Sequence, residues 1–207
     1  MTERPARIRR NDPQGLRARI LDSAARLFQE RGYHATGMRD VMQDTGVSSG
    51  ALHHHFPTKD ALALAVITDR IGPIVRAAWI DPVRRGPSLG KAVAQVFTDI
   101  TRGIEERGAV TGCPLNNLAM ELSFSSPQLR APLEAIFQEW QSVLADRIGE
   151  TSAGARLDRR KRAAAATFII AAYSGAMNLA KTTQSASPLR TAASNLAVWL
   201  SERSFAT

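Results

Sequence analysis

Residues 36–56 read Thr36-Gly-Met-Arg-Asp-Val-Met-Gln-Asp-Thr-Gly-Val-Ser-Ser-Gly-Ala-Leu-His-His-His-Phe56. Two short runs with helical apolar spacing, about Met38–Thr45 and about Ser49–Phe56, lie on either side of Gly46. Glycine adopts the left-handed conformation of a sharp turn, and a serine such as Ser48 caps the helix that follows it. The pattern predicts a helix-turn-helix.

Two helices this short are not stable alone, because helix nucleation is costly, so they need a third helix to pack against. The preceding segment supplies one: Leu16, Ile20, Ala24, Leu27 and Phe28 share one helical face that ends at Gly32, a candidate left-handed cap. We predict that the core of this three-helix unit also contains Val41, Met42, Val47, Leu52 and Phe56. Outward positions on the second short helix would reach base edges or phosphates in a major groove: Ser48, Ser49, His53 and His54.

The remainder of the chain also has helical periodicity, and no segment alternates as a strand does. Thr58 is expected to cap a long helix that Gly72-Pro73 kinks, with a break from Asp81 to Pro87. Cys113-Pro114 is expected to begin another helix. The sequence therefore predicts an all-α protein of about nine helices, with an N-terminal helix-turn-helix unit and a C-terminal helical bundle.

Composition narrows the class of protein. The formal net charge of +8 suits a polyanionic partner, although a soluble basic protein has the same balance. The single cysteine, Cys113, excludes a disulfide within the chain and favours a reducing cytoplasm. The basic segment Met1–Pro13 lacks the apolar stretch of a signal peptide. Ala163–Ala180 is rich in alanine and contains Asn178, so we expect a buried helix and no membrane span.

The residues from Arg17 to Tyr33, Thr36, Met38-Arg-Asp-Val41 and Gly46 to Leu62 resemble, in register, the DNA-binding domain of TetR/AcrR-type repressors. The resemblance implies that Thr36 and Lys59 hold phosphates and that Ser48–His54 face the major groove. It also implies that Arg7, Arg9 and Arg10 form an arm over the minor groove; a solvated tail is the alternative. The chain departs from the family at His53, where a tyrosine is usual. The predicted DNA-binding set is Thr36, Arg39, Ser48, Ser49, Gly50, His53, His54 and Lys59.

The resemblance divides the chain into a basic arm (1–13), a DNA-binding domain (14–60) and a ligand-binding and dimerisation domain (61–207). In this family the last two helices usually pair with those of a second copy. The segment Asp158–Lys181 is apolar around most of its circumference, which requires cover on two sides. We predict a homodimer that reads a palindromic operator, with the small residues Ala165, Ala172, Ser174, Gly175 and Ala176 against the partner.

A small-molecule inducer needs a pocket between helices, lined mostly by apolar groups with a few polar ones. Asn117 and Met120 lie opposite the apolar face of their predicted helix, so they require a partner or a cavity. For each candidate taken singly, an ordinary core position is the alternative. The candidates are Phe97, Thr101, Ile104, Cys113, Asn117, Met120, Phe137, Trp140, Tyr173 and Met177.

Other functions were weighed against a repressor released by an inducer. A thiol at a helix N-terminus can have a depressed pKa, so an oxidant- or electrophile-sensing repressor acting through Cys113 is the alternative. Successive residues of a helix diverge by about 100°, so His53, His54 and His55 cannot converge on one metal ion. All four histidines lie far in sequence from Cys113, which argues against an enzyme with a Cys–His pair. A constitutive architectural DNA binder stays open. We predict no cofactor.

Overall fold

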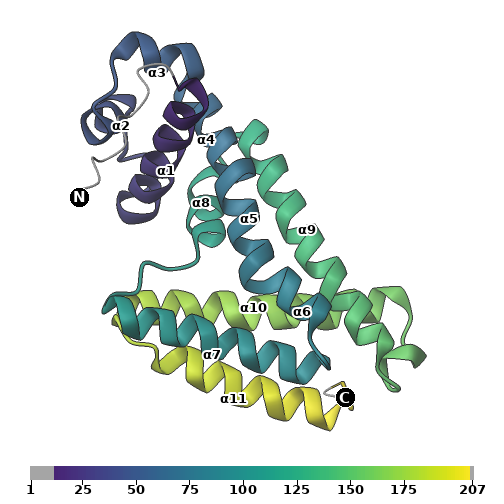
Figure 1. Ribbon diagram of the computed structural model, residues 1–207. Coiled ribbons are helices and arrows are strands. Elements are labelled where there is room, and N and C mark those ends of the chain that lie inside the picture. The colour runs from purple at the N-terminus through teal and green to yellow at the C-terminus, as the bar shows by residue number, and fades with distance from the viewer. Residues whose placement is uncertain (1–11, 206–207) are drawn as a thin grey trace, which may run out of the picture.

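The computed structural model describes residues 12–205, and all of the regular structure in that range is helical (Figure 1). The first helices are α1 (Pro13–Arg31), α2 (Met38–Thr45) and α3 (Ser49–His55). Then come α4 (Lys59–Val66), α5 (Gly72–Val75) and α6 (Asp81–Arg85), joined by the π turns Ile67–Ile71 and Arg76–Ile80. The rest are α7 (Leu89–Arg107), α8 (Pro114–Leu122), α9 (Pro127–Glu150), a 3-10 turn (Gly154–Arg156), α10 (Arg159–Thr183) and α11 (Ser187–Glu202). Because α4 to α6 are continuous, the described residues form nine helices, which confirms the predicted fold class.

The helices form a small head and a larger bundle (Figure 1). The head consists of α1, α2 and α3, and the continuous helix α4–α6 leads from it into the bundle. At the opposite end of the molecule α7, α10 and α11 lie side by side, while α8 and α9 lie beside the continuous helix. The predicted boundary between residues 60 and 61 thus falls inside a helix, and one hydrophobic core extends through both parts.

Local sequence accounts for the shape of the head. Gly46 ends α2 in the left-handed conformation with φ 69°, and the Ser48 hydroxyl caps α3 by accepting from the Ala51 N–H at 3.3 Å. Thr58 caps α4 by accepting from the Ala61 N–H at 3.0 Å. Leu52 and Phe56 are buried against the inner face of α1, as the apolar pattern predicts. The expected turn and caps are therefore confirmed.

Two details differ from expectation: where the long helix breaks, and the cap at Gly32. The helix does not break at Asp81 but continues to Arg85, with the break at Gly86-Pro87. At Gly72-Pro73, where a kink is predicted, the helix is continuous and its hydrogen bonding widens to π turns on both sides of Pro73, which has no N–H to donate. Gly32 has positive φ (87°), but its ψ of 160° is extended, so it is not a left-handed cap.

The centre of the bundle is an aromatic cluster. Trp79, Phe97, Trp140 and Tyr173 pack ring against ring, with centroids 4.9 Å apart for Trp79–Trp140 and 4.8 Å for Trp79–Tyr173. All four are buried. The four rings come from four different helices, so the cluster joins the continuous helix to α7, α9 and α10.

Candidate functional site

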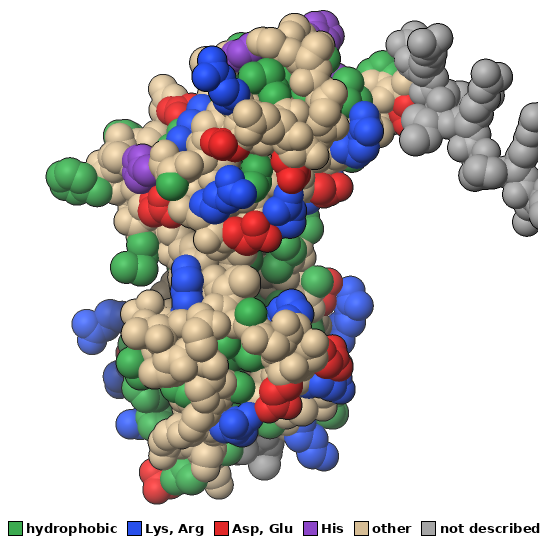
Figure 2. All heavy atoms as spheres, turned by 90° about the vertical axis from the view of Figure 1, so that its left-hand side faces the viewer, with side chains coloured by type: hydrophobic (Ala, Val, Ile, Leu, Met, Phe, Trp, Pro, Cys, Tyr) green, Lys and Arg blue, Asp and Glu red, His purple; other side chains and the backbone are tan. Residues whose placement is uncertain are grey.

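The outer surface of α3 is polar and open to solvent. Five predicted DNA-contacting residues are exposed there, and α3 lies at the end of the molecule farthest from α11 (Figure 1). Figure 2 shows histidine side chains at this end, beside lysine and arginine side chains of the head. A helix that stands free at the tip of the head can enter a major groove. The exposed residues are Ser48, Ser49, Gly50, His53 and His54, and Arg39 is exposed on α2.

The two predicted phosphate contacts are placed differently from expectation. Thr36 is completely buried, and its hydroxyl donates to the carbonyl oxygens of Gly32 at 2.8 Å and Leu27 at 3.3 Å. The prediction that this hydroxyl holds a phosphate is wrong for this structure, because Thr36 ties the end of α1 to the turn. Lys59 is half-buried, with its Nζ 4.1 Å from the centre of the Tyr33 ring. Desolvation lowers the pKa of Lys59. The arginines of the predicted arm lie outside the described residues.

Polar contacts hold the head rigid behind α3. Asp44 of α2 accepts from the Ser23 hydroxyl at 2.5 Å and pairs with Arg26 of α1. These hydrogen bonds lower the pKa of Asp44. Tyr33 donates its hydroxyl hydrogen to Asp60 at the start of α4, and burial raises the pKa of this phenol. α2 is therefore fixed to α1, and α4 is fixed to the loop that follows α1, which keeps α3 in one orientation.

A cavity of about 470 Å³ lies in the bundle between α8 and α10. Cys113, Asn116, Asn117 and Met120 line it from α8 and its N-cap, and Ser174, Met177, Asn178 and Lys181 line it from α10. Both sets have the spacing i, i+3, i+4, i+7, so each is one stripe of its helix. The other lining residues are Gly112, Ala119, Phe137 and Gly175.

The structure brings half of the predicted ligand-contacting residues to this cavity: Cys113, Asn117, Met120, Phe137 and Met177. Trp140 and Tyr173 instead lie in the aromatic cluster, and Ile104 is buried in α7. Phe97 and Thr101 border a second hollow, between α7 and α11. These five residues do not line the α8–α10 cavity, because their helices turn those faces toward the packed core or toward α11.

The sequence reasoning missed Asn116, Ser174, Asn178 and Lys181. Their signal was present in the sequence: Asn116, Ser174 and Lys181 each lie one helical turn from a predicted residue, and Asn178 follows Met177 directly. Ser174 was predicted to pack against a partner, whereas Asn178 and Lys181 were given no contact. A stripe that mixes amide, hydroxyl and ammonium groups with methionine is typical of a ligand-binding wall.

Comparison with known proteins identifies the family. Residues 20–66 match the family described as "Bacterial regulatory proteins, tetR family", and residues 90–195 match "Transcriptional regulator LmrA/YxaF-like, C-terminal domain". The second match alone covers about half of the chain. The chain belongs to the TetR family of bacterial transcriptional regulators. The predicted resemblance is confirmed. Members of this family bind DNA and regulate transcription, so the chain is a DNA-binding transcriptional regulator.

Full-length relatives of this TetR regulator include the HTH-type transcriptional regulator LmrA of Bacillus subtilis, 28% identical over 84% of this chain and 90% of that protein. The HTH-type transcriptional repressor DhaR of Mycobacterium sp. is 26% identical over 84% of this chain and 86% of that protein. A crystal structure of a TetR transcriptional regulator from Chloroflexus aurantiacus has a TM-score of 0.79 and 30% identity, covering 94% of this chain and 98% of that one. The family is one of transcription regulators and not of enzymes.

In this TetR regulator the cavity wall contacts the head directly. The Asn117 amide donates to Gln29 Oε1 of α1 at 3.1 Å, and Gln29 in turn donates to the Gly112 carbonyl at 2.8 Å. One turn further along α8, Glu121 accepts from the His34 N–H at 3.0 Å. α8 therefore has one face toward the cavity and another toward α1.

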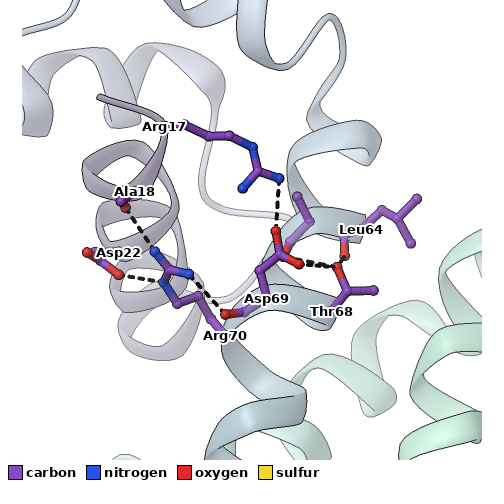
Figure 3. A network of polar contacts seen from close by, with 8 residues as sticks. Arg17, Ala18, Asp22, Leu64, Thr68, Asp69 and Arg70 are labelled. Atoms are coloured by element: carbon purple, nitrogen blue, oxygen red, sulfur yellow. Dashed lines mark hydrogen bonds and ion pairs between the residues drawn. The ribbon is translucent and has the colours of Figure 1, made fainter. Parts of the chain in front are cut away.

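A second set of contacts joins α1 to the continuous helix α4–α6 (Figure 3). Arg17 pairs with Asp69 at 2.8 Å, and Arg70 pairs with Asp22 at 2.6 Å while donating to the Ala18 carbonyl at 3.3 Å. The hydrogen bond from Arg17 is the main cause of the lowered pKa of Asp69. The head is thus held to the bundle on two sides, by α8 and by the first π turn.

Cys113 does not have the properties of a reactive thiol. It is buried at the N-cap of α8, and desolvation raises its pKa, although the N–H groups of Asn116 and Leu115 act in the opposite direction. A thiol with a raised pKa is mostly protonated and a poor nucleophile. The expectation of a depressed pKa is therefore wrong, and the thiol-sensing alternative is not supported.

Two further properties of the described residues concern metal ions and membranes. No group of three or more His, Cys, Asp or Glu side chains among residues 12–205 is placed to hold a metal ion. α10 has the length and mean hydropathy (1.4) of a membrane span, and 33% of its most apolar window is buried. This helix lies within the matched C-terminal domain of the TetR regulator and packs on α9 and α11.

We predict different effects for two neighbouring serines of α3. Ser48→Ala should lower the free energy of unfolding by about 1 kcal/mol, because the N-cap hydrogen bond is lost. Ser49→Ala should leave stability unchanged and weaken DNA binding, because Ser49 is exposed in the first turn and its side chain caps nothing. Urea unfolding and fluorescence anisotropy with bound DNA measure the two effects. Equal stability losses for both variants would contradict the assignment of Ser48 as the cap.

Proposed function

We propose that the protein is a cytoplasmic, homodimeric repressor that binds a palindromic operator and releases it when a small molecule occupies the α8–α10 cavity. The observation that carries the proposal is the direct contact between cavity wall and head, through Asn117 and Gln29. The same short helix lines the cavity and holds α1, against which the DNA-facing helix packs. A ligand that moves α8 therefore changes how the head is held.

The exposed apolar face of α10 and α11 supports the homodimer. Phe168, Leu179 and Val198 are 47%, 59% and 55% exposed, and Phe168 stacks near Trp199 of α11 with centroids 4.7 Å apart. A contiguous apolar face of two helices fits a second copy related by a twofold axis. The small residues proposed for this contact need revision. Ala176 is buried in its own fold, whereas Ala164, Ala171 and Gly175 are exposed along with Phe168 and Leu179.

Similarity to a named repressor and the geometry of a twofold dimer support the proposed repression and the palindromic operator. DhaR is named a transcriptional repressor and aligns over most of both chains. In a twofold dimer the two α3 helices would lie about 34–36 Å apart, one turn of DNA, which suits two half-sites of a palindrome. The DNA contacts we propose are Arg39, Ser48, Ser49, Gly50, His53, His54 and Lys59; Arg7, Arg9 and Arg10 remain a proposal outside the described residues.

The test is selection of bound sequences from random DNA by the purified protein, followed by a metabolite panel applied to the complex. We expect an enriched palindrome and release by at least one class of metabolite. Recovery of sequences without a palindrome would overturn the proposal and favour an architectural DNA binder. Palindrome binding that no metabolite relieves would overturn the inducer part alone.

Gln29→Ala provides a test of the coupling. It removes the hydrogen bonds from α1 to Asn117 and to the loop at Gly112, and neither of these bonds involves α3. We expect the affinity for the operator without inducer to change less than about threefold. The inducer concentration that releases half of the DNA should change about fivefold or more, because two coupled binding sites typically share a coupling free energy of about 1–3 kcal/mol. Anisotropy titration measures both quantities. Gln95→Ala, at an exposed position of α7, is the control, and an unchanged inducer response in Gln29→Ala would contradict this route.

A further inference from the structure

We infer that the cavity takes a small organic anion with an apolar body, and that Lys181 binds its anionic group. The inference rests on the proposal that this cavity is the inducer site, and it adds the chemical class of the ligand. Three features of the cavity carry it: the charge of its wall, the apolar residues that lie among the polar ones, and the contact of Lys181 with Asn117.

The wall of the cavity carries one full charge. Lys181 is the basic residue among those that line it, and none of the lining residues in the described chain is Asp or Glu. The Lys181 ammonium donates to the neutral amide oxygen Asn117 Oδ1 at 3.2 Å. An ammonium has three donors, so hydrogens are left for a ligand. A half-buried cation beside amides, without a carboxylate on the wall, favours an anionic ligand group over a cationic one.

Apolar residues make up part of the same wall. Phe137, Met120, Met177 and Ala119 supply it, and Met120 is 80% exposed at the mouth of the cavity. Methionine and phenylalanine side chains bind flat aromatic or aliphatic groups without directional demands. A cavity of about 470 Å³ is within the range that holds drug-sized molecules. The shape and composition suit an aromatic or branched organic acid rather than a simple inorganic anion.

Lys181 is also connected to the head through hydrogen bonds. Lys181 holds Asn117 Oδ1, and the other end of the same amide donates to Gln29. Gly112 is packed tightly beside both: a Cβ at this position would lie 2.9 Å from Asn117 Oδ1 and 3.0 Å from Lys181 Cδ. An anion that draws the ammonium into the cavity therefore releases one end of the Asn117 amide. The ligand and Asn117 Oδ1 both accept from the Lys181 ammonium, and the amide nitrogen of the same Asn117 donates to α1.

The experiment uses two dyes with the same aromatic framework: anilinonaphthalene sulfonate, which is an anion, and phenylnaphthylamine, which lacks the sulfonate. Each is titrated by fluorescence into the full chain without DNA. We expect Lys181→Met to raise the Kd of the sulfonate about tenfold, the effect of one charge-assisted hydrogen bond, and to change the Kd of the neutral dye less than twofold. Lys181→Arg keeps the charge and should keep most of the sulfonate affinity. Lys91→Met, at an exposed lysine of α7, is the matched control.

Unchanged sulfonate binding in Lys181→Met, or an equal loss for both dyes, would overturn the inference. An equal loss for Lys91→Met would show attraction by net charge alone and would overturn it too. Circular dichroism of each variant establishes that it is folded, and Lys181→Gln, which also removes the charge, replaces Lys181→Met if that variant does not fold. The result is independent of DNA: failure of the operator selection refutes the proposed repressor, whereas failure here refutes the anionic ligand only.

Discussion

Trp140→Ala is expected to lower the free energy of unfolding by about 3–5 kcal/mol, the usual range for removal of a large buried aromatic ring. The Trp140 ring has 0% exposure and packs against both Trp79 and Tyr173, with centroids 4.9 Å and 5.7 Å away. Its removal leaves a cavity at the point where α9 meets the continuous helix and α10. Urea unfolding followed by circular dichroism measures the loss, at one fixed protein concentration because association contributes to stability.

Two further variants distinguish the stability contribution of a core ring from that of a ring that lines the cavity. Trp140→Phe keeps a ring and removes an indole N–H that has no hydrogen-bond partner among the described residues, so it should cost less than Trp140→Ala. Phe137 is half-buried and lines the α8–α10 cavity. Phe137→Ala should lower the free energy of unfolding by less than about 2 kcal/mol, because the exposed part of the ring contributes no stabilisation by burial. A loss below about 1 kcal/mol for Trp140→Ala would mean that the ring is not part of the core.

The comparison of Trp140 with Phe137 shows where sequence reasoning reaches its limit. Both lie on α9 and were equally good candidates for a ligand pocket. Periodicity tells which residues share a helix face, but not whether that face meets a packed helix or an empty space. The answer depends on how α8, α9 and α10 are spaced, which tertiary packing decides. For the same reason, the sequence shows that Lys181 shares a helix face with other polar residues, but it does not show that this face lines a cavity.

The head was more predictable, because its geometry depends on local chemistry. Gly46, Ser48 and Thr58 act through backbone conformation and hydrogen bonds within a few residues, and each was identified from its position in the sequence. Thr36 is the exception. Its role by family resemblance was a phosphate contact, whereas its hydroxyl bonds the carbonyls of Leu27 and Gly32 in the interior. Motif membership places a residue in the fold but does not give the direction of its side chain.

Leu179→Arg is expected to give the largest functional effect: a monomer at micromolar concentration and a loss of operator affinity of about a hundredfold or more. Leu179 is 59% exposed on α10, in the apolar face assigned to the second copy. An arginine there would place an unpaired charge in the proposed interface, twice by symmetry. Linking two DNA-binding heads raises affinity by about 10²–10⁴, so separating them removes that factor. Sedimentation velocity and anisotropy with operator DNA measure both effects.

Ile74→Arg is the matched control, because Ile74 is a large apolar residue of similar exposure (47%) on α5, away from α10 and α11. It should remain dimeric and bind the operator as the unmodified protein does. Neither variant should unfold, since each side chain is largely in solvent in the single chain. The decisive quantity is therefore the difference between the two variants. A dimeric Leu179→Arg with full operator affinity would move the twofold axis to another face, and the exposed Phe168, Leu179 and Val198 of α10 and α11 would then need a different partner.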